Sequence, residues 1–456
     1  MITCNCAPCH HFVVFNAMAV NVQIFTGTFI HCKKIDEPEV IEDGVMVIHC
    51  QKIVHIGDSS TYDKQRKSFP TAEIIKLTPT QILIPGLIDT HIHAPQYPNS
   101  GLGYDKPLLE WLTAYTYPTE TLFKESAFAQ LVYDAVVRKT IAHGTTTAAY
   151  FATIFKDTNL LLADACIKNG QRAFIGKVNM ITLAPKDYIE TRESSIADTK
   201  QFIKDVYAKK SDLVQPIITP RFALSVDTEL MLDLADIVEE FDLNIQTHIS
   251  ENKEEIDQVK KAYGMGYAEA YDNARLLTPK TILAHGIYLE DDELKLLEKK
   301  GTSISHCPSS NTLLKSGMCD VRKILKAKVK VGLGTDVAGG AQPSIIEAMR
   351  KAIEVSTCIS FGKNCCYQPL NYAEVFYLAT LGGAAALGIE EKVGNFEVGK
   401  EFDAVIVDMD VKNSAVDYFK RCTPLELLQK FIFLGDDRNV INVFVQGKKV
   451  KGGDSH

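Results

Sequence analysis

Residues 85–385 alternate strand-like and helix-like segments with a period of about 40 residues. Aliphatic and β-branched runs indicate eight strands, and stretches such as 228–241 and 291–300 indicate the helices between them. Eight βα units favour a (β/α)8 TIM-type barrel, an α/β fold whose active site lies at the carboxyl ends of the strands. A doubly wound open sheet would need a glycine-rich phosphate turn after its first strand, which this sequence lacks. The predicted strands are residues 84–93, 145–151, 172–180, 213–219, 244–248, 281–285, 302–306 and 329–335.

The two ends of the chain resemble each other in pattern and differ from the middle. Residues 20–25, 27–31 and 45–57 suggest short strands, the last of them a hairpin, and 403–407 and 440–450 suggest strands at the far end. Neither end can bury a core alone, so we expect them to combine into one small β-sandwich domain. The predicted division is thus a β-domain of residues 20–84 and 386–450, and a barrel domain of residues 85–385.

Composition excludes several classes of function. The 456 residues carry a net charge of -8, and no cluster of lysine and arginine suggests a nucleic-acid surface. The longest apolar runs are shorter than the roughly 20 residues that a membrane helix needs. The 12 cysteines are irregularly spaced, which is typical of a reducing, cytoplasmic compartment.

The N-terminal residues need a separate interpretation. Cys6, Cys9 and His10 match a haem-attachment pattern, and the sequence near Met18 imitates a signal cleavage site. There is no lysine or arginine before residue 33, so we interpret both matches as chance. We expect residues 1–19 to be a disordered tail, and Met18 is an alternative start.

The first predicted barrel strand ends in a His-x-His pair. Because successive strand side chains alternate between faces, His91 and His93 must point the same way, and Asp89 points with them. Two imidazoles on one face can chelate a single metal ion. Taken alone, the pair is as consistent with buried structural histidines as with ligands.

Polar residues recur where the other predicted strands end. A barrel gathers strand ends at one mouth, so these side chains are candidates for a single site. They are His93, Arg221, His248, His285, His306 and Asp336.

One ligand set within this group suits zinc. His91, His93, His248 and Asp336 provide nitrogen and oxygen ligands and leave a position for water, as catalytic sites require. The metal would convert that water to hydroxide near neutral pH. Glu251 follows in the first turn of the next predicted helix, where we expect its carboxylate to move protons.

Several motifs together resemble the amidohydrolase superfamily, in its aromatic deaminase and chlorohydrolase branch. Three further stretches resemble the guanine deaminase family within that branch, and the resemblance extends from about residue 20 to residue 448. The superfamily motifs are residues 84–93, 306–311, 334–336 and 394–400, and the narrower ones are residues 107–112, 219–222 and 248–252.

The resemblance implies zinc-dependent hydrolysis of guanine by water, giving xanthine and ammonia, with one Zn²⁺ per chain. It implies that the four residues above hold the metal and that Glu251, His285 and Asp336 are catalytic. Related barrels are commonly dimers, so by analogy we expect a homodimer. Arg221 would donate to the carbonyl of the neutral base, and Phe222 would pack on its ring. The substrate-binding residues it implies are His93, Gln96, Arg221, Phe222, His248, Glu251 and Asp336.

Alternatives remain at this stage. A cytosine, thiomethyladenosine or triazine hydrolase would share the metal site and differ at Gln96, Arg221 and Phe222. A non-catalytic, dihydropyrimidinase-related scaffold would keep the barrel and lose ligands, whereas every ligand position is filled here. The other zinc-deaminase architecture is excluded, because its His-x-Glu and Pro-Cys-x-x-Cys elements are absent.

Overall fold

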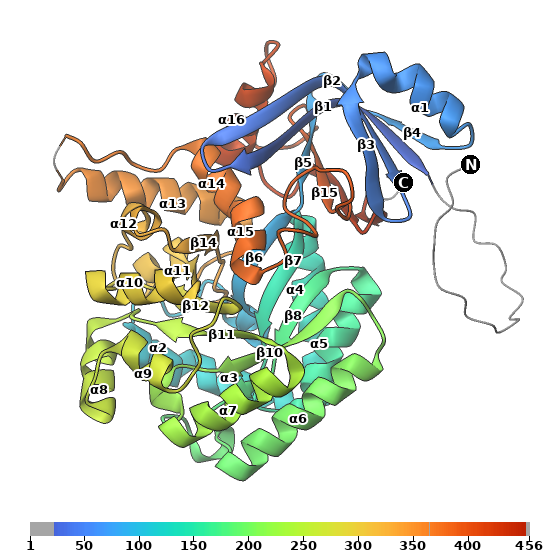
Figure 1. Ribbon diagram of the computed structural model, residues 1–456. Coiled ribbons are helices and arrows are strands. Elements are labelled where there is room, and N and C mark those ends of the chain that lie inside the picture. Colours follow the sequence, from blue (N-terminus) through green and yellow to red (C-terminus); the bar gives the residue numbers. More distant parts are fainter. Residues whose placement is uncertain (1–21, 364, 453–456) are drawn as a thin grey trace, which may run out of the picture.

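The computed structural model describes residues 22–363 and 365–452, which form a barrel and a smaller sheet beside it (Figure 1). The predicted tail at residues 1–19, with its haem-like pattern, lies outside the described residues. Within the described part, no helix is both long and apolar enough to cross a bilayer.

The barrel prediction is confirmed. Its strands pair in parallel in the order β6-β7-β8-β10-β11-β12-β13-β14, and β9 pairs with β10. The ends of this path meet, because the backbone N–H of Asp336 donates to the carbonyl of His91 (2.9 Å) and that of His93 donates to Val337 (3.0 Å). The strands are β6 (Leu87–His93), β7 (Thr145–Phe151), β8 (Arg172–Gly176), β9 (Val178–Asn179), β10 (Val214–Pro220), β11 (Asn244–Ile249), β12 (Thr281–His285), β13 (Ser303–His306) and β14 (Lys330–Leu333).

Helices cover the outside of the barrel, and short helices lie within the loops at its mouth. The 228–241 prediction is confirmed as α7. Its N-cap residue is Asp227, whose side chain accepts a hydrogen bond from the backbone N–H of Leu230 (2.7 Å). The 291–300 prediction is confirmed as α10, which ends at Gly301 with φ +70°. The helices are α1 (Tyr62–Ser68), α2 (Leu108–Trp111), α3 (Tyr117–Thr121), α4 (Ser126–Ala142), α5 (Lys156–Asn169), α6 (Arg192–Ala208), α7 (Thr228–Phe241), α8 (Lys253–Tyr263), α9 (Tyr267–Asn273), α10 (Asp291–Lys300), α11 (Pro308–Leu313), α12 (Val321–Lys326), α13 (Ile345–Ser360), α14 (Tyr372–Ala379), α15 (Leu381–Leu387) and α16 (Pro424–Leu434).

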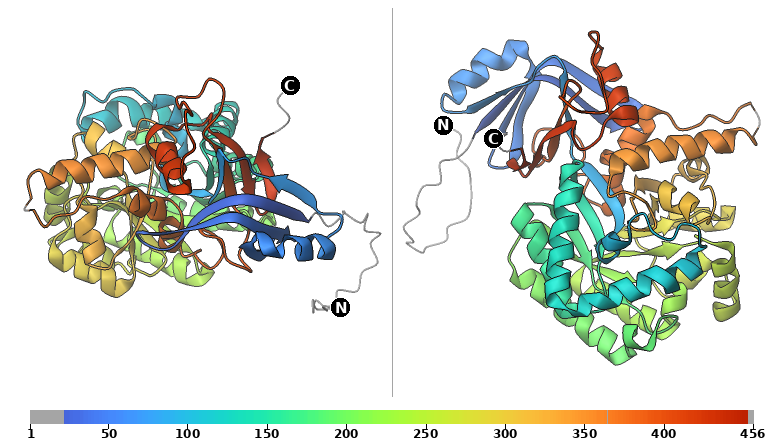
Figure 2. Two further views of the ribbon diagram at one scale, coloured as in Figure 1. Left: turned by 90° about the horizontal axis from the view of Figure 1, so that it is seen from above. Right: turned by 180° about the vertical axis from the view of Figure 1, so that it is seen from behind.

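The N- and C-terminal segments share one mixed sheet, in which the blue and red strands of Figure 2 lie side by side. The joining pair is antiparallel, between β5 and β15. Hydrogen bonding runs continuously through the order β17-β16-β15-β5-β1-β2-β3, with β4 beside β1, so the domain is one sheet rather than the two of a sandwich. Its strands are β1 (Gln23–Lys34), β2 (Glu37–His49), β3 (Lys52–Asp58), β4 (Glu73–Lys76), β5 (Gln81–Pro85), β15 (Ala404–Asp408), β16 (Val440–Val445) and β17 (Lys448–Lys451).

Three predicted strands differ in detail. Residues 20–25 and 27–31 contribute to one strand, β1, whose pairing with β2 shifts after Gly27, where φ is +136°. The predicted strand 172–180 is divided between β8 and β9 at Lys177, whose buried ammonium donates to the carbonyl of Val178 (3.1 Å) and pairs with Glu190.

The predicted strand 84–93 crosses from one sheet to the other. Residues 84 and 85 end β5 in the small sheet, and β6 of the barrel begins at residue 87. Between them lies Gly86, where an added Cβ would be 2.0 Å from Oγ1 of Thr146. Only glycine fits this close crossing, which brings the His-x-His strand into the barrel directly from the β-domain.

Candidate active site

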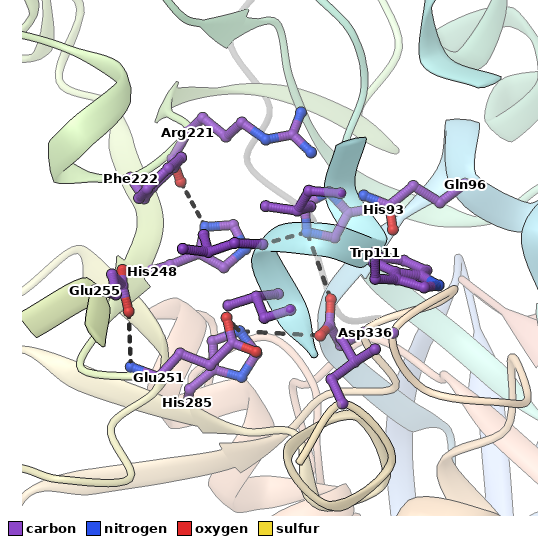
Figure 3. A pocket seen from close by; sticks show the side chains of 15 residues that line it. His93, Gln96, Trp111, Arg221, Phe222, His248, Glu251, Glu255, His285 and Asp336 are labelled. Atoms are coloured by element: carbon purple, nitrogen blue, oxygen red, sulfur yellow. Dashed lines mark hydrogen bonds and ion pairs between the residues drawn. The ribbon is translucent and has the colours of Figure 1, made fainter. Parts of the chain in front are cut away.

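A cavity opens at the carboxyl ends of the barrel strands (Figure 3). It encloses about 510 Å³ of empty space, part of it open to solvent. One part of its lining consists of histidines and carboxylates and the other of apolar side chains. The lining residues are His93, Gln96, Leu108, Leu109, Trp111, Leu112, Arg221, Phe222, His248, Glu251, Glu255, His285, Leu314, Asp336 and Gly339.

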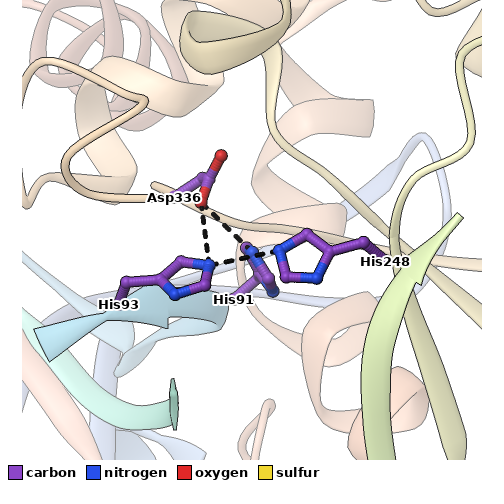
Figure 4. A group of neighbouring side chains, drawn as sticks. All are labelled: His91, His93, His248 and Asp336. Atoms are coloured by element: carbon purple, nitrogen blue, oxygen red, sulfur yellow. Dashed lines mark hydrogen bonds and ion pairs between the residues drawn. The ribbon is translucent and has the colours of Figure 1, made fainter. Parts of the chain in front are cut away.

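Four of the predicted residues converge at the base of this cavity (Figure 4). Each of His91, His93, His248 and Asp336 offers one ligand-type atom, and these atoms all lie within 4.8 Å of one another. Oδ1 of Asp336 is 3.2 Å from Nε2 of His91 and 3.5 Å from Nε2 of His93. Nε2 of His93 is 3.2 Å from Nε2 of His248.

This cluster fits a small divalent cation. Ligand atoms bonded to one zinc ion at about 2.0–2.1 Å lie roughly 3–4 Å apart. The three separations given above, 3.2–3.5 Å, fall in this range. Nε2 of His91, which faces Oδ1 of Asp336, is buried and has no hydrogen-bond partner among the described residues. Buried polar atoms are normally paired, so an unpaired imidazole nitrogen that faces a carboxylate is well suited to a metal.

Ionisation in the cluster also suits a metal. Burial and the neighbouring His91 hold the pKa of His93 and of His248 well below the ordinary value, which favours the neutral, ligating imidazole. Burial raises the pKa of Asp336, but His91, His285 and His93 together lower that pKa more, so it lies below its usual range. The set is therefore neutral nitrogen ligands with one carboxylate.

Hydrogen bonds orient the ligand side chains from behind. Nδ1 of His248 donates to the carbonyl of Arg221 (2.5 Å), which leaves Nε2 free to face the cluster. Asp89 is fully buried and accepts from the backbone N–H of His91 (3.2 Å) and from the hydroxyl of Thr335 (2.6 Å). Asp89 thereby joins the first strand to the segment that carries Asp336.

The backbone at three of the strand ends is turned into the left-handed region. Ser250, His285 and Asp336 have φ values of +50°, +74° and +48°. Such conformations are unfavourable for residues other than glycine and occur preferentially at functional sites. Here they stop each strand and redirect the chain at the mouth of the barrel.

Glu251 and His285 form a pair of titratable groups beside the cluster. Oε2 of Glu251 lies 3.4 Å from Nε2 of His285, whose Nδ1 donates to Oδ1 of Asn311 (2.8 Å). Burial raises the pKa of Glu251 to about 7. Burial lowers the pKa of His285, but Glu251 and Asp336 raise it more, so the net change is upward. A carboxyl with a pKa near neutrality suits proton transfer.

Arg221 has a partner that the sequence did not suggest. Its Nη1 and Nη2 donate to both oxygens of Glu120, at 2.5 and 3.0 Å, and both side chains are buried. Nε2 of Gln96 donates to the same carboxylate (2.9 Å). Arg221 still lines the cavity, so it has both a buried ion pair and a surface toward a ligand.

The structure brings together all the residues predicted for metal, catalysis and substrate, and His91 reaches the cluster beneath the cavity lining. His306 is the exception among the strand-end residues, because it is buried and does not line the cavity. Sequence reasoning gave no role to Glu120, Glu255 or Trp111. Trp111 is the only tryptophan of the chain and lies in the motif at residues 107–112, which was the available signal.

Comparisons with known proteins agree with this geometry. The family model described as the amidohydrolase family matches residues 82–450. Guanine deaminase of Pongo abelii is 47% identical over 438 residues, which are 94% of this chain and 96% of that protein. Guanine deaminase of Dictyostelium discoideum is 44% identical, and the match covers 94% of this chain and 98% of that protein. The crystal structure of guanine deaminase from C. acetobutylicum with bound guanine matches with a TM-score of 0.87 and 36% identity. The match covers 94% of this chain and 100% of that chain.

Proposed function

This chain belongs to the amidohydrolase family, and we propose that it deaminates guanine, using one zinc ion per chain. The reaction replaces the 2-amino group of guanine with oxygen from water and releases xanthine and ammonia. The observation that carries the proposal is that one cavity combines a metal-ligand set with the hydrogen-bond donors of Arg221 and Gln96, which we call the donor edge. The identity of 44–47% to guanine deaminases over nearly the whole chain supports the choice of base.

His91, His93, His248 and Asp336 would hold the zinc ion, because their ligand atoms face one another at suitable separations. When bound, zinc would supply an activated water and a positive charge beside the reacting carbon. Three neutral imidazoles and one carboxylate leave a net positive charge there, which favours addition of an oxygen nucleophile.

Glu251 would carry protons between the attacking water and the base. Its pKa of about 7 lets it accept the proton of the water and then donate it to the ring nitrogen next to C2. Ser316 donates to its other oxygen, Oε1 (3.2 Å), and so holds the carboxylate in place. When the C–N bond breaks, the amino group must leave as ammonia, which requires a second proton.

His285 and Asp336 would complete the proton transfers. Nε2 of His285 lies 3.9 Å from Oδ2 of Asp336 and faces Glu251, so the imidazole stands between the two carboxylates. With its raised pKa it can carry a positive charge next to the oxygen that develops negative charge at C2. Oδ2 of Asp336 can accept the remaining proton of the water.

The opposite side of the cavity would hold the base. In the view of Figure 3, Arg221 and Gln96 lie in the upper part and Glu251 and His285 in the lower part, with His93 and His248 between them. Arg221 and Gln96 would donate to the carbonyl edge of guanine. Phe222, which is 8% exposed, would pack against the ring.

The alternatives from the sequence are less well supported. A non-catalytic scaffold would not need four ligand-type residues assembled around one point, or a carboxyl with a pKa near 7 beside them. Cytosine, thiomethyladenosine and triazine hydrolases share the fold, but their substrates do not place a purine carbonyl against Arg221.

We extend the proposal to the setting of the enzyme. Residues 85–385 would be the catalytic domain, residues 20–84 with 386–450 the β-domain, and the assembly a homodimer by analogy with related barrels. The compartment would be the cytoplasm and the role guanine catabolism. Cys32, Cys166 and Cys307 are buried free thiols, as is usual in a reducing compartment.

The test is an assay of purified protein against guanine, adenine, cytosine and guanosine, with released ammonia as the readout. We expect ammonia from guanine, and turnover of the other three to be close to background. Preferred turnover of cytosine or adenine would overturn the proposal while leaving the family assignment in place.

A further inference from the structure

Glu120 is a buried carboxylate that binds the substrate-facing residues from behind. It lies on α3 with 0% exposure and does not line the cavity. Its Oε1 accepts hydrogen bonds from Arg221 Nη2 (3.0 Å) and Gln96 Nε2 (2.9 Å). Its Oε2 accepts from Arg221 Nη1 (2.5 Å) and from the hydroxyl of Tyr188 (2.7 Å). A carboxylate offers about four acceptor positions, so none remains for a ligand.

These bonds decide which groups Gln96 shows to the cavity. The amide nitrogen of Gln96 donates to Glu120, and its Oε1 accepts from the backbone N–H of Ala338 (3.2 Å). The side chain therefore cannot rotate by 180° without placing its oxygen against the carboxylate. One amide hydrogen stays available, while Oε1 is held against the main chain of Ala338, so the group that Gln96 keeps free for the cavity is a donor.

Arg221 is constrained in the same way. Two of its five N–H groups are used by Glu120. Its Cζ lies over the ring of Tyr117, 5.3 Å from the ring centroid. The N–H groups that remain can only donate. Both residues at this edge of the cavity thus have free donors, and Glu120 is the partner that they share.

We propose that Glu120 is a positioning residue that makes the enzyme selective for a purine with a carbonyl at C6, because it aims the free donors of Arg221 and Gln96 at that oxygen. The inference rests on the proposed guanine deaminase activity and deepens it. A buried donor edge that meets a C–H or an amino group leaves its donors unpaired, which is costly. Selectivity would therefore originate one layer behind the residues that touch the base.

A pair of substrates separates this role from a merely structural one. 2-Aminopurine has the same 2-amino group as guanine, and carries hydrogen in place of the carbonyl at C6. If Glu120 aims donors at that carbonyl, Glu120→Gln must harm guanine and spare 2-aminopurine. A general loss of structure would lower kcat/KM for both by the same factor.

The experiment measures kcat and KM for both substrates in wild-type protein, Glu120→Gln and Glu120→Asp. Where turnover of 2-aminopurine is slow, its binding is measured as competitive inhibition of guanine turnover. For Glu120→Gln we expect kcat/KM for guanine to fall by roughly 10–100-fold, as for the loss of hydrogen bonds to charged groups, and mostly through KM. For 2-aminopurine we expect a change under about 3-fold. Glu110→Gln, at a carboxylate that is 57% exposed, is the matched control and should behave as wild type.

Each outcome has a definite meaning. Equal losses for both bases, or no loss for guanine, would overturn the role of Glu120 even if wild-type protein deaminates guanine. Failure of the wild-type protein on guanine would overturn the proposed function and this inference together. If Glu120→Gln does not fold, Glu120→Asp retains the negative charge beside Arg221, and the same ratio of guanine to 2-aminopurine decides. Zinc content and circular dichroism show that each variant is intact.

Discussion

Nδ1 of His248 and the main-chain carbonyl of Arg221 are joined by a hydrogen bond of 2.5 Å. The imidazole belongs to the candidate metal-ligand set, while Arg221 lines the cavity that we propose to bind the base. A single residue after β10 therefore orients a candidate metal ligand with its backbone and, in the function that we propose, would contact substrate with its side chain. This connection fixes the distance between the candidate metal site and the side chain of Arg221, which the proposed reaction at C2 of a base held by its C6 carbonyl would require.

The metal cluster leads to the first prediction. Purified protein should contain about one zinc ion per chain, and chelation should abolish deamination, because the ligand set matches a catalytic zinc site. His248→Ala and Asp336→Ala should lose both zinc and activity. His49→Ala, in the small sheet, is the control and should retain both. The measurements are metal analysis and ammonia release, and full activity in metal-free protein would contradict the mechanism.

The second prediction separates proton transfer from metal binding. Glu251→Gln keeps the size of the side chain and removes its ability to accept a proton. We expect zinc content to be unchanged and kcat for guanine to fall roughly 10²–10⁴-fold, the usual range for a general acid–base group. Glu251 precedes α8, which begins at Lys253, and is not in its first turn as the sequence suggested. Glu254→Gln, at an exposed position in the first turn of α8, should leave kcat as it is. Loss of zinc from Glu251→Gln would instead identify Glu251 as a ligand.

Much of this site could be predicted because it depends on local pattern and on barrel topology. Alternation along one strand brings His91 and His93 to the same side, and the meeting of strand ends brings His248, His285 and Asp336 to them. The switch between sheets at Gly86 was not predicted, because the apolar run through it is continuous and its close contact is with Thr146, far along the chain.

The role of Glu120 could not be predicted for a similar reason. It pairs with Arg221 across 101 positions of sequence, and a glutamate on a short helical segment is most often a solvated residue. Only the packed barrel shows that this carboxylate is buried. Long-range pairing between charged side chains leaves no periodic signal in a single sequence.

The third prediction concerns stability and pH, and involves His31 in the small sheet. Burial lowers the pKa of His31 to about 4, and Nδ1 accepts a hydrogen bond from the backbone N–H of Phe396 (3.4 Å). The ordinary pKa of histidine in an unfolded chain is about 6.5, so between these values the unfolded state binds more protons. The stability contributed by neutral His31 is therefore complete above pH 6.5 and is lost as the pH falls toward 4.

At pH 5 this loss should be about 2 kcal/mol of the free energy of unfolding. His31→Asn keeps an acceptor near Phe396 and does not titrate. Between pH 7 and pH 5, the free energy of unfolding of the variant should therefore fall by about 2 kcal/mol less than that of the wild type. Urea unfolding of zinc-loaded protein at both values of pH measures the difference. Parallel pH dependences in wild type and variant would show that His31 is not responsible.

The last prediction tests how the cavity chooses its base. Guanine and adenine differ at two positions. Adenine lacks the 2-amino group that the reaction removes, and at C6 it has an amino group where guanine has the carbonyl that we pair with Arg221. A buried guanidinium that faces an amino group sets donor against donor, and sites built around a required hydrogen bond reject the analogue by roughly 10⁴-fold. Guanosine should fail for a different reason, because we expect Phe222, which lines the cavity, to leave no room for a ribose.

Arg221→Ala should raise KM for guanine more than Phe222→Leu does, since it removes the donors themselves, whereas Phe222→Leu leaves an apolar wall. Arg221→Ala also leaves Glu120 buried without its counterion, so a loss of stability of about 3–5 kcal/mol is expected alongside. Arg221→Lys separates the two effects, because a lysine retains the charge and cannot reproduce the two-point pairing. If wild-type protein had comparable kcat/KM for guanine and adenine, Arg221 would not recognise the carbonyl, and the assignment of guanine as substrate would fail with it.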